Sequence, residues 1–258
     1  MSLGRENALV LEVTVMLLDI DYLLLGMPGI ALSLWAQWQI VSACSAASRL
    51  PASSGLTGSE AARRLMQASG VRPVDITPAS GQLSNHYDPS RKVLRLSQSV
   101  CAGRSLAALG VAAHEAGHAI QQASRYPGLI VRNAIVPIAN LGSIAFWLLI
   151  LAGPFLGMFR LIIWGLALFS LIVVLQLINV PIEFDASRRA RQTLLATGLV
   201  TQEEGAVVGR VMNAAAWTYV AAILTSVMSP LCSLFPFRLL FEFSAGLPTP
   251  PNSEEAIK

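Results

Sequence analysis

The string His114-Glu115-Ala116-Gly117-His118 is the part of the sequence whose residue types and spacing most clearly suit chemistry. Residues four positions apart lie on one face of a helix, so both imidazoles can reach one metal ion. An imidazole nitrogen binds zinc at about 2.0–2.1 Å, and a glutamate between the two can act on the attacking water without binding the metal. The pattern therefore predicts one Zn²⁺ per chain, with His114 and His118 as ligands and Glu115 as catalytic base.

A third ligand has to come from elsewhere, because catalytic zinc usually keeps three protein ligands and one open position. No third histidine extends the motif, and His86 is the only other histidine in the chain. The best candidate is Glu183, the first charged residue after a long apolar stretch. Asp185 is the rival, although two positions along a helix it points away from Glu183 by about 200°. The alternative for Glu183 is an ordinary carboxylate near the start of the next helix.

A site that hydrolyses peptides also needs a group to stabilise the oxyanion of the transition state. Four residues are candidates for transition-state or substrate contacts: His86, Tyr87, Arg188 and Tyr219. Two of them have other interpretations. His86 can be a turn histidine bonded to Asp88, and Tyr219 can anchor a helix at a membrane interface.

The composition indicates that these residues belong to a membrane protein. The chain has 258 residues, of which 54% are hydrophobic and 13% are charged, against about 25% charged in soluble domains. Asp, Glu, Lys and Arg are absent from 22–48, 133–159, 161–182 and 211–237. Each stretch exceeds the roughly 20 residues that a spanning helix needs. The sequence therefore predicts four transmembrane helices, at 22–41, 134–153, 161–181 and 214–235.

The basic residues predict an orientation. Segment 42–132 carries ten Lys and Arg, segment 182–210 carries four, and the rest of the chain carries four. Because basic loops stay in the cytoplasm, both polar segments are expected there. This predicts a multi-pass membrane protein whose active site faces the cytoplasm.

The expected fold is a mainly α membrane protein with a small cytoplasmic α+β zincin-like domain. That domain, 42–132, contains a helix that begins at the capping-box pattern of Thr57 and Glu60, a strand at 71–76, a hairpin of 83–87 with 92–96, and the HExxH helix at 105–124. The third ligand lies in a cytoplasmic helical segment at 182–213. The remaining parts are an N-terminal extension at 1–21 and a C-terminal tail at 236–258.

Several strings give the chain a family resemblance. They are Asn85-His-Tyr-Asp-Pro89, Leu94-Arg-Leu-Ser97, Val111–Gln121 around the two histidines, Glu183-Phe-Asp-Ala-Ser-Arg-Arg-Ala190 and Asn213-Ala-Ala-Ala-Trp-Thr-Tyr-Val-Ala-Ala222. Over roughly 20–240 the chain resembles the bacterial YugP-like membrane zinc metallopeptidases, and more distantly the HtpX and CAAX-prenyl endopeptidase group. The resemblance implies Glu183 as third ligand. The distant group has Asp four positions after that Glu, where this chain has Ser187.

The predicted function is an integral-membrane zinc endopeptidase that cleaves membrane or membrane-proximal proteins. The expected partners are a polypeptide substrate and the lipid bilayer, with no nucleic acid, and similarity to HtpX adds membrane quality-control partners. One alternative is a site-2-type intramembrane protease, whose HExxH lies within a membrane helix. The other is a non-catalytic membrane scaffold or metal-handling protein with structural zinc. Structural sites usually have four protein ligands, often Cys, and no cysteine lies near this motif.

Overall fold

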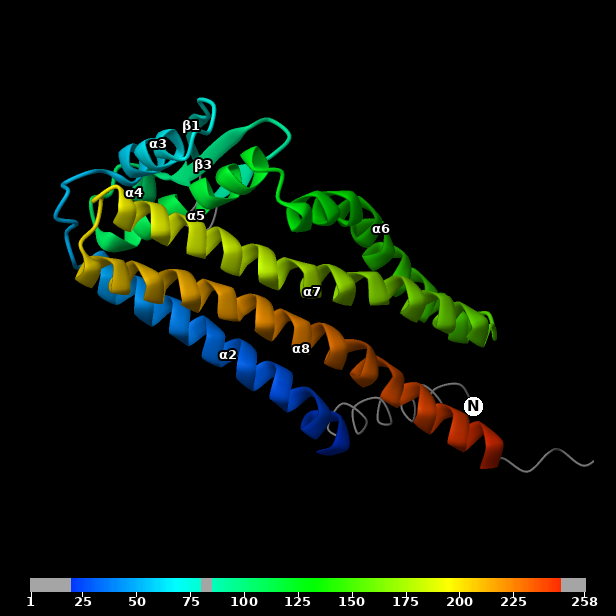
Figure 1. The fold of residues 1–258 in the computed structure, drawn as a ribbon. Coiled ribbons are helices and arrows are strands. Elements are labelled where there is room, and N and C mark those ends of the chain that lie inside the picture. Colours follow the sequence, from blue (N-terminus) through cyan, green and yellow to red (C-terminus); the bar gives the residue numbers. More distant parts are fainter. Residues whose placement is uncertain (1–19, 80–84, 247–258) are drawn as a thin grey trace, which may run out of the picture. The chain divides into compact units, whose positions relative to one another are not determined.

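Long helices make up most of the chain, as Figure 1 shows for a computed structural model that describes residues 20–79 and 85–246. The helices are α2 (Ile20–Ser48), α3 (Gly58–Ala68), α4 (Gln98–Cys101), α5 (Leu106–Ala123), α6 (Pro127–Phe155), α7 (Phe159–Ala196) and α8 (Gln202–Gly246). The strands are β1 (Asp75–Ala79), β2 (His86–Asp88) and β3 (Val93–Ser97). The predicted mainly α fold is confirmed. Nearly all of the predicted N-terminal extension and the end of the predicted tail lie outside the described residues.

The chain divides into two compact units. Residues 32–223 form one, and residues 1–31 with 224–258 form the other. In the second unit, α2 meets α8 at Gly29, where an added side-chain carbon would lie 3.6 Å from Thr225 Cα. All the candidate site residues belong to the first unit.

Three helices are long and apolar enough to cross a membrane. Within the described residues these are Pro127–Gly153 of α6, Arg160–Ala196 of α7 and Gln202–Met228 of α8. They overlap three of the predicted spans, although their bounds differ from the predicted ones. The remaining predicted span, 22–41, lies in α2. This segment is helical, but α2 is not one of the three helices that are long and apolar enough, so a membrane span at 22–41 stays a prediction.

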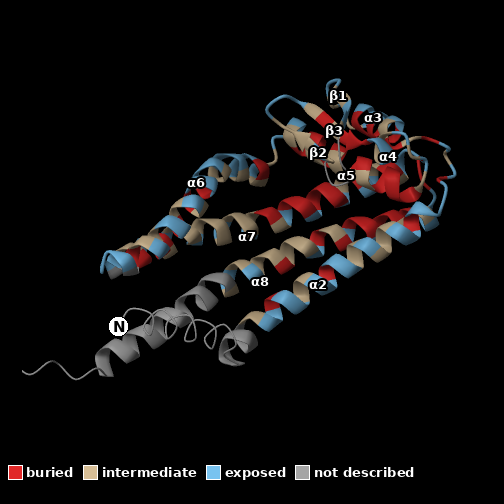
Figure 2. Cartoon of the chain, turned by 180° about the vertical axis from the view of Figure 1, so that it is seen from behind, coloured by how far each residue is buried: buried red, intermediate tan, exposed pale blue. Residues whose placement is uncertain are grey.

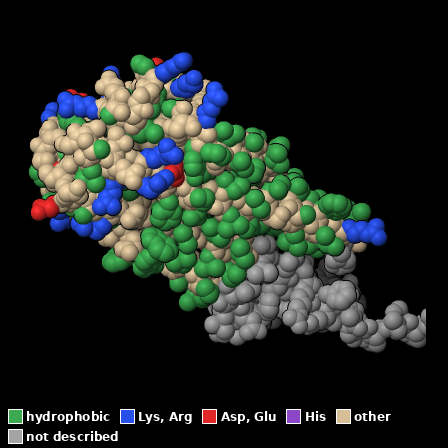
Figure 3. Space-filling view, in the orientation of Figure 1, with side chains coloured by type: hydrophobic (Ala, Val, Ile, Leu, Met, Phe, Trp, Pro, Cys, Tyr) green, Lys and Arg blue, Asp and Glu red, His purple; other side chains and the backbone are tan. Residues whose placement is uncertain are grey.

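The surface of the long helices is apolar, as a lipid-facing surface should be. Leu141 is 70% exposed, Ile163 66% and Phe155 90%. Figure 3 shows hydrophobic side chains covering the helical part of this face, while Lys and Arg gather mainly at the end that holds the sheet. Exposure of so many large apolar side chains would be unfavourable in water and is expected in a bilayer.

The turn between α6 and α7 contains only residues 156–158. Gly157 lies there in the left-handed region, with φ of 63°, which glycine adopts without steric cost. The two helices approach closely along their length, because a side-chain carbon on Gly165 would lie 3.3 Å from Leu149 Cβ. The two helices therefore form a tight hairpin, and Arg160 is the only charged residue between the uncharged stretches 133–159 and 161–182.

Helix α7 continues without interruption beyond its apolar stretch to Ala196, with Pro181 inside it. Glu183 therefore lies within a long helix, and its interpretation as a helix-start carboxylate is wrong. The missing N–H of a proline does not end a membrane helix when neighbouring helices satisfy the backbone. In the same way, α8 joins the polar residues after 201 to the predicted fourth apolar stretch.

The core of the part of the chain that carries the sheet lies among α3, α5, β3 and the adjoining parts of α7 and α8. Figure 2 shows the buried residues gathered there. Its fully buried side chains include Leu65, Leu94, Leu109, Leu194 and Val208. The predicted capping box is confirmed, since Thr57 Oγ1 accepts from the N–H of Glu60 and the Glu60 carboxylate accepts from the N–H of Thr57.

The small sheet has the order β1-β3-β2, with β1 parallel and β2 antiparallel to β3. The predicted hairpin is confirmed where it is described, with His86 opposite Arg95. Asp88 forms its turn by accepting from the N–H of Ser90 and Arg91, both at 3.0 Å. The strand predicted at 71–76 is misplaced: β1 begins at Asp75, after Pro73. Pro78 lies inside β1, which an edge strand tolerates because not all of its N–H groups need a partner in the sheet.

Candidate active site

Helix α5 brings the two motif histidines together one turn apart. Ser105 caps this helix by accepting from the N–H of Ala108, and an apolar face of Leu109, Ala112 and Ala116 buries it in the core. The rings of His114 and His118 lie edge to face, with centroids 5.0 Å apart. The predicted spacing therefore places both imidazoles on one side of the helix.

Helix α7 supplies a carboxylate to the same point. Glu183 is only 3% exposed, and its Oε2 lies 3.0 Å from His114 Nε2 and 3.4 Å from His118 Nε2. The two helices come this close because Gly117 faces the backbone of Ala186, where a side-chain carbon would lie 2.5 Å from the carbonyl oxygen. Asp185, the rival ligand, points elsewhere and bonds to Gln121, Arg188 and Arg189.

The ligand atoms offered by His114, His118 and Glu183 all lie within 4.8 Å of one another. Two imidazole nitrogens and one carboxylate oxygen are a usual donor set for catalytic zinc. Two ligands on a tetrahedral zinc stand about 3.3 Å apart, given metal–ligand distances of about 2.0–2.2 Å. The observed separations of 3.0 and 3.4 Å fit that spacing, so these residues suit a zinc ion.

The far nitrogen of each imidazole is held by a polar partner. Ser187 Oγ lies 3.0 Å from His114 Nδ1, and Gln121 Oε1 lies 3.0 Å from His118 Nδ1. Gln121 is fully buried and is itself fixed, because its Nε2 donates to Ile182 O and to Asp185 Oδ2. Bonds of this kind orient metal-binding histidines and set which nitrogen faces the metal. Both Nε2 atoms are thereby directed towards Glu183.

The electrostatics of the cluster favour a bound cation. Burial lowers the pKa of His118, but the hydrogen bond and charge of Glu183 and the charge of Glu115 outweigh it, so that the pKa is raised above its ordinary value. A raised imidazole pKa means that the surroundings stabilise positive charge. A zinc ion at the same point would meet the same favourable field.

Glu115 is held by the edge strand of the sheet. Its Oε2 accepts from the N–H of Tyr87 in β2 at 3.1 Å. The strand is in turn attached to α5, because the Tyr87 hydroxyl bonds to Gln122 Oε1 and Gln122 Nε2 donates to Pro89 O. Glu115 is therefore positioned beside the cluster without joining it, which is the place that a base acting on water requires.

These residues surround a cavity of about 130 Å³, named here the metal cavity. Its lining comes from five elements and the residues just before and just after β2: Asn85, His86, Tyr87, Pro89, His114, Glu115, His118, Leu129, Arg132, Glu183 and Tyr219. Three of the four predicted contact residues, His86, Tyr87 and Tyr219, are among them. Arg188 is not, because the Asp185 carboxylate one turn earlier on α7 holds its guanidinium outside the metal cavity.

Sequence reasoning missed Arg132 as a site residue and counted it only as a basic charge. Its Nε donates to Asn179 Oδ1 at 2.9 Å, which joins α6 to α7 beside the cavity. A signal was present, because Arg132 is the last charge before one apolar stretch and Glu183 is the first charge after the next. Two antiparallel helices joined by a short turn bring such positions to the same level.

Comparison with known proteins agrees with the chemistry of the cluster. Residues 22–237 match a protein family described as "Putative neutral zinc metallopeptidase", and the chain belongs to that family. It is thus a zinc metallopeptidase by class, a hydrolase. Among curated proteins it is similar to the "Putative membrane protease YugP" of Bacillus subtilis (strain 168), with 43% identity over 220 residues that cover 85% of this chain and 96% of the relative. No solved structure shows significant similarity to the chain.

Proposed function

We propose that this protein is an integral-membrane endopeptidase that binds one Zn²⁺ per chain through His114, His118 and Glu183. The meeting of these three side chains from α5 and α7 is the observation that carries the proposal. When bound, the ion would polarise the scissile carbonyl and the attacking water. Ser187 and Gln121, which bond to His114 and His118, keep the two imidazoles in a fixed orientation during the reaction.

The proton transfers are assigned to Glu115. Its carboxylate takes a proton from the attacking water and delivers it to the leaving amine, as a general base and then a general acid. The N–H of Tyr87 fixes the carboxylate in this position. Arg132 and Tyr219, which line the same cavity, are the donors proposed for the oxyanion, with His86 at its exposed side.

The proposed substrate is a polypeptide of the membrane or its surface, cleaved on the cytoplasmic side of the bacterial inner membrane. The distribution of Lys and Arg supports this orientation. Helix α5 is not among the described helices that are long and apolar enough to span a membrane, which supports a site outside the bilayer over an intramembrane one. The membrane quality-control role is proposed by similarity to the HtpX group alone.

The decisive test is Glu115→Gln in the full-length protein. Zinc content, measured by mass spectrometry of the metal, should stay near one per chain, while hydrolysis of an unfolded membrane-protein substrate falls by about 10²–10⁴-fold. Glu183→Gln, in contrast, should lose both the zinc and the hydrolysis. Glu203→Gln, which changes an exposed acid in the first turn of α8, serves as the matched control. Zinc that all three variants retain, with no hydrolysis even by the unaltered protein, would favour the structural-zinc scaffold.

A further inference from the structure

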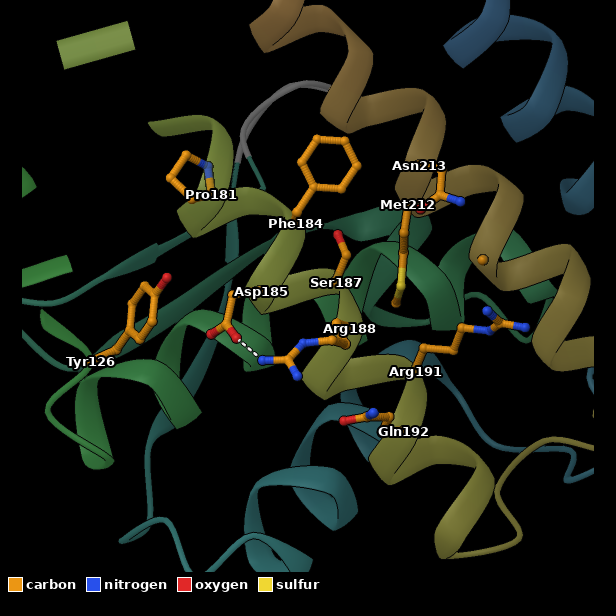
Figure 4. Close-up of a pocket in the computed structure, with 11 residues that line it drawn as sticks. Tyr126, Pro181, Phe184, Asp185, Ser187, Arg188, Arg191, Gln192, Met212 and Asn213 are labelled. Carbon is orange, nitrogen blue, oxygen red and sulfur yellow. Dashed lines mark hydrogen bonds and ion pairs between the residues drawn. The ribbon is translucent and has the colours of Figure 1, made fainter. Parts of the chain in front are cut away.

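A second and larger pocket lies between α7 and α8, outside the metal cavity. It has a volume of about 580 Å³ and is shown in Figure 4. Its wall on α7 includes Pro181, Phe184, Arg188 and Arg191, and Met212 of α8 contributes on the other side. We call this the headgroup pocket. No step of the proposed peptidase mechanism uses it.

The headgroup pocket carries an excess of positive charge. Asp185 is the one acidic residue in its lining, against Arg188 and Arg191. That carboxylate is also bonded to Arg189, whose guanidinium lies 5.6 Å from the ring centre of Tyr126. Two arginines, Arg188 and Arg189, therefore bond to this one carboxylate, and Arg191 adds a further positive charge to the lining. An anion that entered the pocket would meet net positive charge.

Arg191 is held in place by its main-chain surroundings. Its Nε donates to Gly205 O at 3.0 Å, and its guanidinium lies over Gly209, where a side-chain carbon would come within 3.2–3.3 Å of it. Among the described residues, its two terminal nitrogens make no hydrogen bond or ion pair. Figure 4 shows the side chain extending from α7 towards α8. A guanidinium fixed at one edge presents the other edge to a phosphate.

The position along α7 identifies the kind of anion. The pocket begins at Pro181, where the uncharged stretch 161–182 ends, and Phe184 beside it is 40% exposed. Trp217, further along α8, is 41% exposed and stacks edge to face on Trp35, as aromatic residues do at a membrane interface. A basic pocket between membrane helices at this level suits a lipid headgroup.

We propose that the headgroup pocket binds the phosphate of an anionic phospholipid, with Arg188 and Arg191 on the phosphate and Phe184 beside an acyl chain. The lipid would lie directly behind the proposed zinc ligands. Ser187 lines the pocket and bonds His114, and Asp185 lines it and holds the Gln121 that bonds His118. The binding itself does not depend on peptidase activity and can be measured without it.

The test titrates dioleoyl phosphatidylglycerol or dioleoyl phosphatidylcholine into detergent-solubilised full-length protein and counts bound lipid by native mass spectrometry. The phosphatidylglycerol should bind more tightly. The double variant Arg188→Gln/Arg191→Gln should weaken it by roughly 25-fold, because each basic residue near an anionic headgroup contributes about fivefold. Arg63→Gln/Arg64→Gln removes two exposed arginines from α3 and should leave binding unchanged.

Three results would overturn the proposal. Equal affinity for the two lipids would exclude recognition of headgroup charge, and equal losses in the two double variants would exclude this pocket. Displacement of the lipid by glycerol 1-phosphate at matching concentrations would make the site one for soluble phosphate. Arg188→Lys/Arg191→Lys keeps both positive charges and should restore most of the binding that the Gln variant loses. Such a recovery would show that the Gln variant loses binding through its missing charge and not through misfolding.

Discussion

Gly117→Ala gives the sharpest test of how α5 and α7 assemble the ligand cluster. A side-chain carbon at position 117 would lie 2.5 Å from Ala186 O, 3.0 Å from its carbonyl carbon and 3.3 Å from its Cα. All three atoms are backbone, so no change of rotamer relieves the clash. Ordinary contact begins near 3.4 Å, and the helices must therefore separate by roughly 0.9 Å.

That displacement is large for a metal site. If most of it falls along the line from α5 to α7, the gaps between Glu183 Oε2 and the two imidazole nitrogens grow from 3.0 and 3.4 Å to roughly 3.9 and 4.3 Å. We expect zinc affinity to fall about 10–100-fold and kcat/KM about 100-fold. Zinc affinity is measured by competition with a chromophoric chelator, and kcat/KM is measured with an unfolded membrane protein as the substrate.

Gly110→Ala is the matched control, since it makes the same change on the same helix. Its added carbon would lie 3.4 Å from Val208 Cγ1, an ordinary contact with a side chain. A helix-interior alanine also gains about 0.5–1 kcal/mol over glycine. This variant should keep the zinc affinity of the unaltered protein. If Gly117→Ala behaves in the same way, close approach at position 117 does not determine the geometry of the cluster.

Substitutions at three further positions separate ligand orientation, oxyanion binding and folding. Ser187→Ala should lower zinc affinity by about 10–100-fold in the chelator competition, because His114 loses its orienting bond, and Ser187→Asp should recover it. Arg132→Gln should lower kcat by about 10²–10³-fold with zinc content unchanged; an unaltered kcat would remove Arg132 from the oxyanion role. Thr57→Ala should lower the free energy of unfolding by about 1 kcal/mol through loss of the helix cap, seen as a lower denaturation midpoint at unchanged zinc affinity.

The local elements could be predicted from sequence wherever a short pattern determines them. The capping box begins α3 next to Thr57, Asp88 makes the predicted turn, and charge-free stretches coincide with α6, α7 and α8. Each signal acts over a few residues or through composition alone. The strand predicted at 71–76 has the same origin, because Val71 and Val74 are typical strand residues although β1 begins only at Asp75.

The candidate site could be predicted only in part, because it joins residues far apart in sequence. Spacing predicts His114 and His118, and position after an apolar stretch indicates Glu183. No local pattern shows that Ser187 and Gln121 orient the two imidazoles, since this depends on how α5 crosses α7. The role of Arg188 stays a prediction: it bonds to Asp185 within the same helix and does not line the metal cavity.

The order of the ligand residues along the chain has a consequence for biosynthesis. The two histidines precede Glu183 by 65 or more residues, and α6 and most of the apolar part of α7 lie between. A nascent chain therefore lacks the third donor until α6 and most of the apolar part of α7 have been synthesised. The cluster can thus assemble only after the hairpin of α6 and α7 has been made, and a chain that stops before Glu183 cannot complete it.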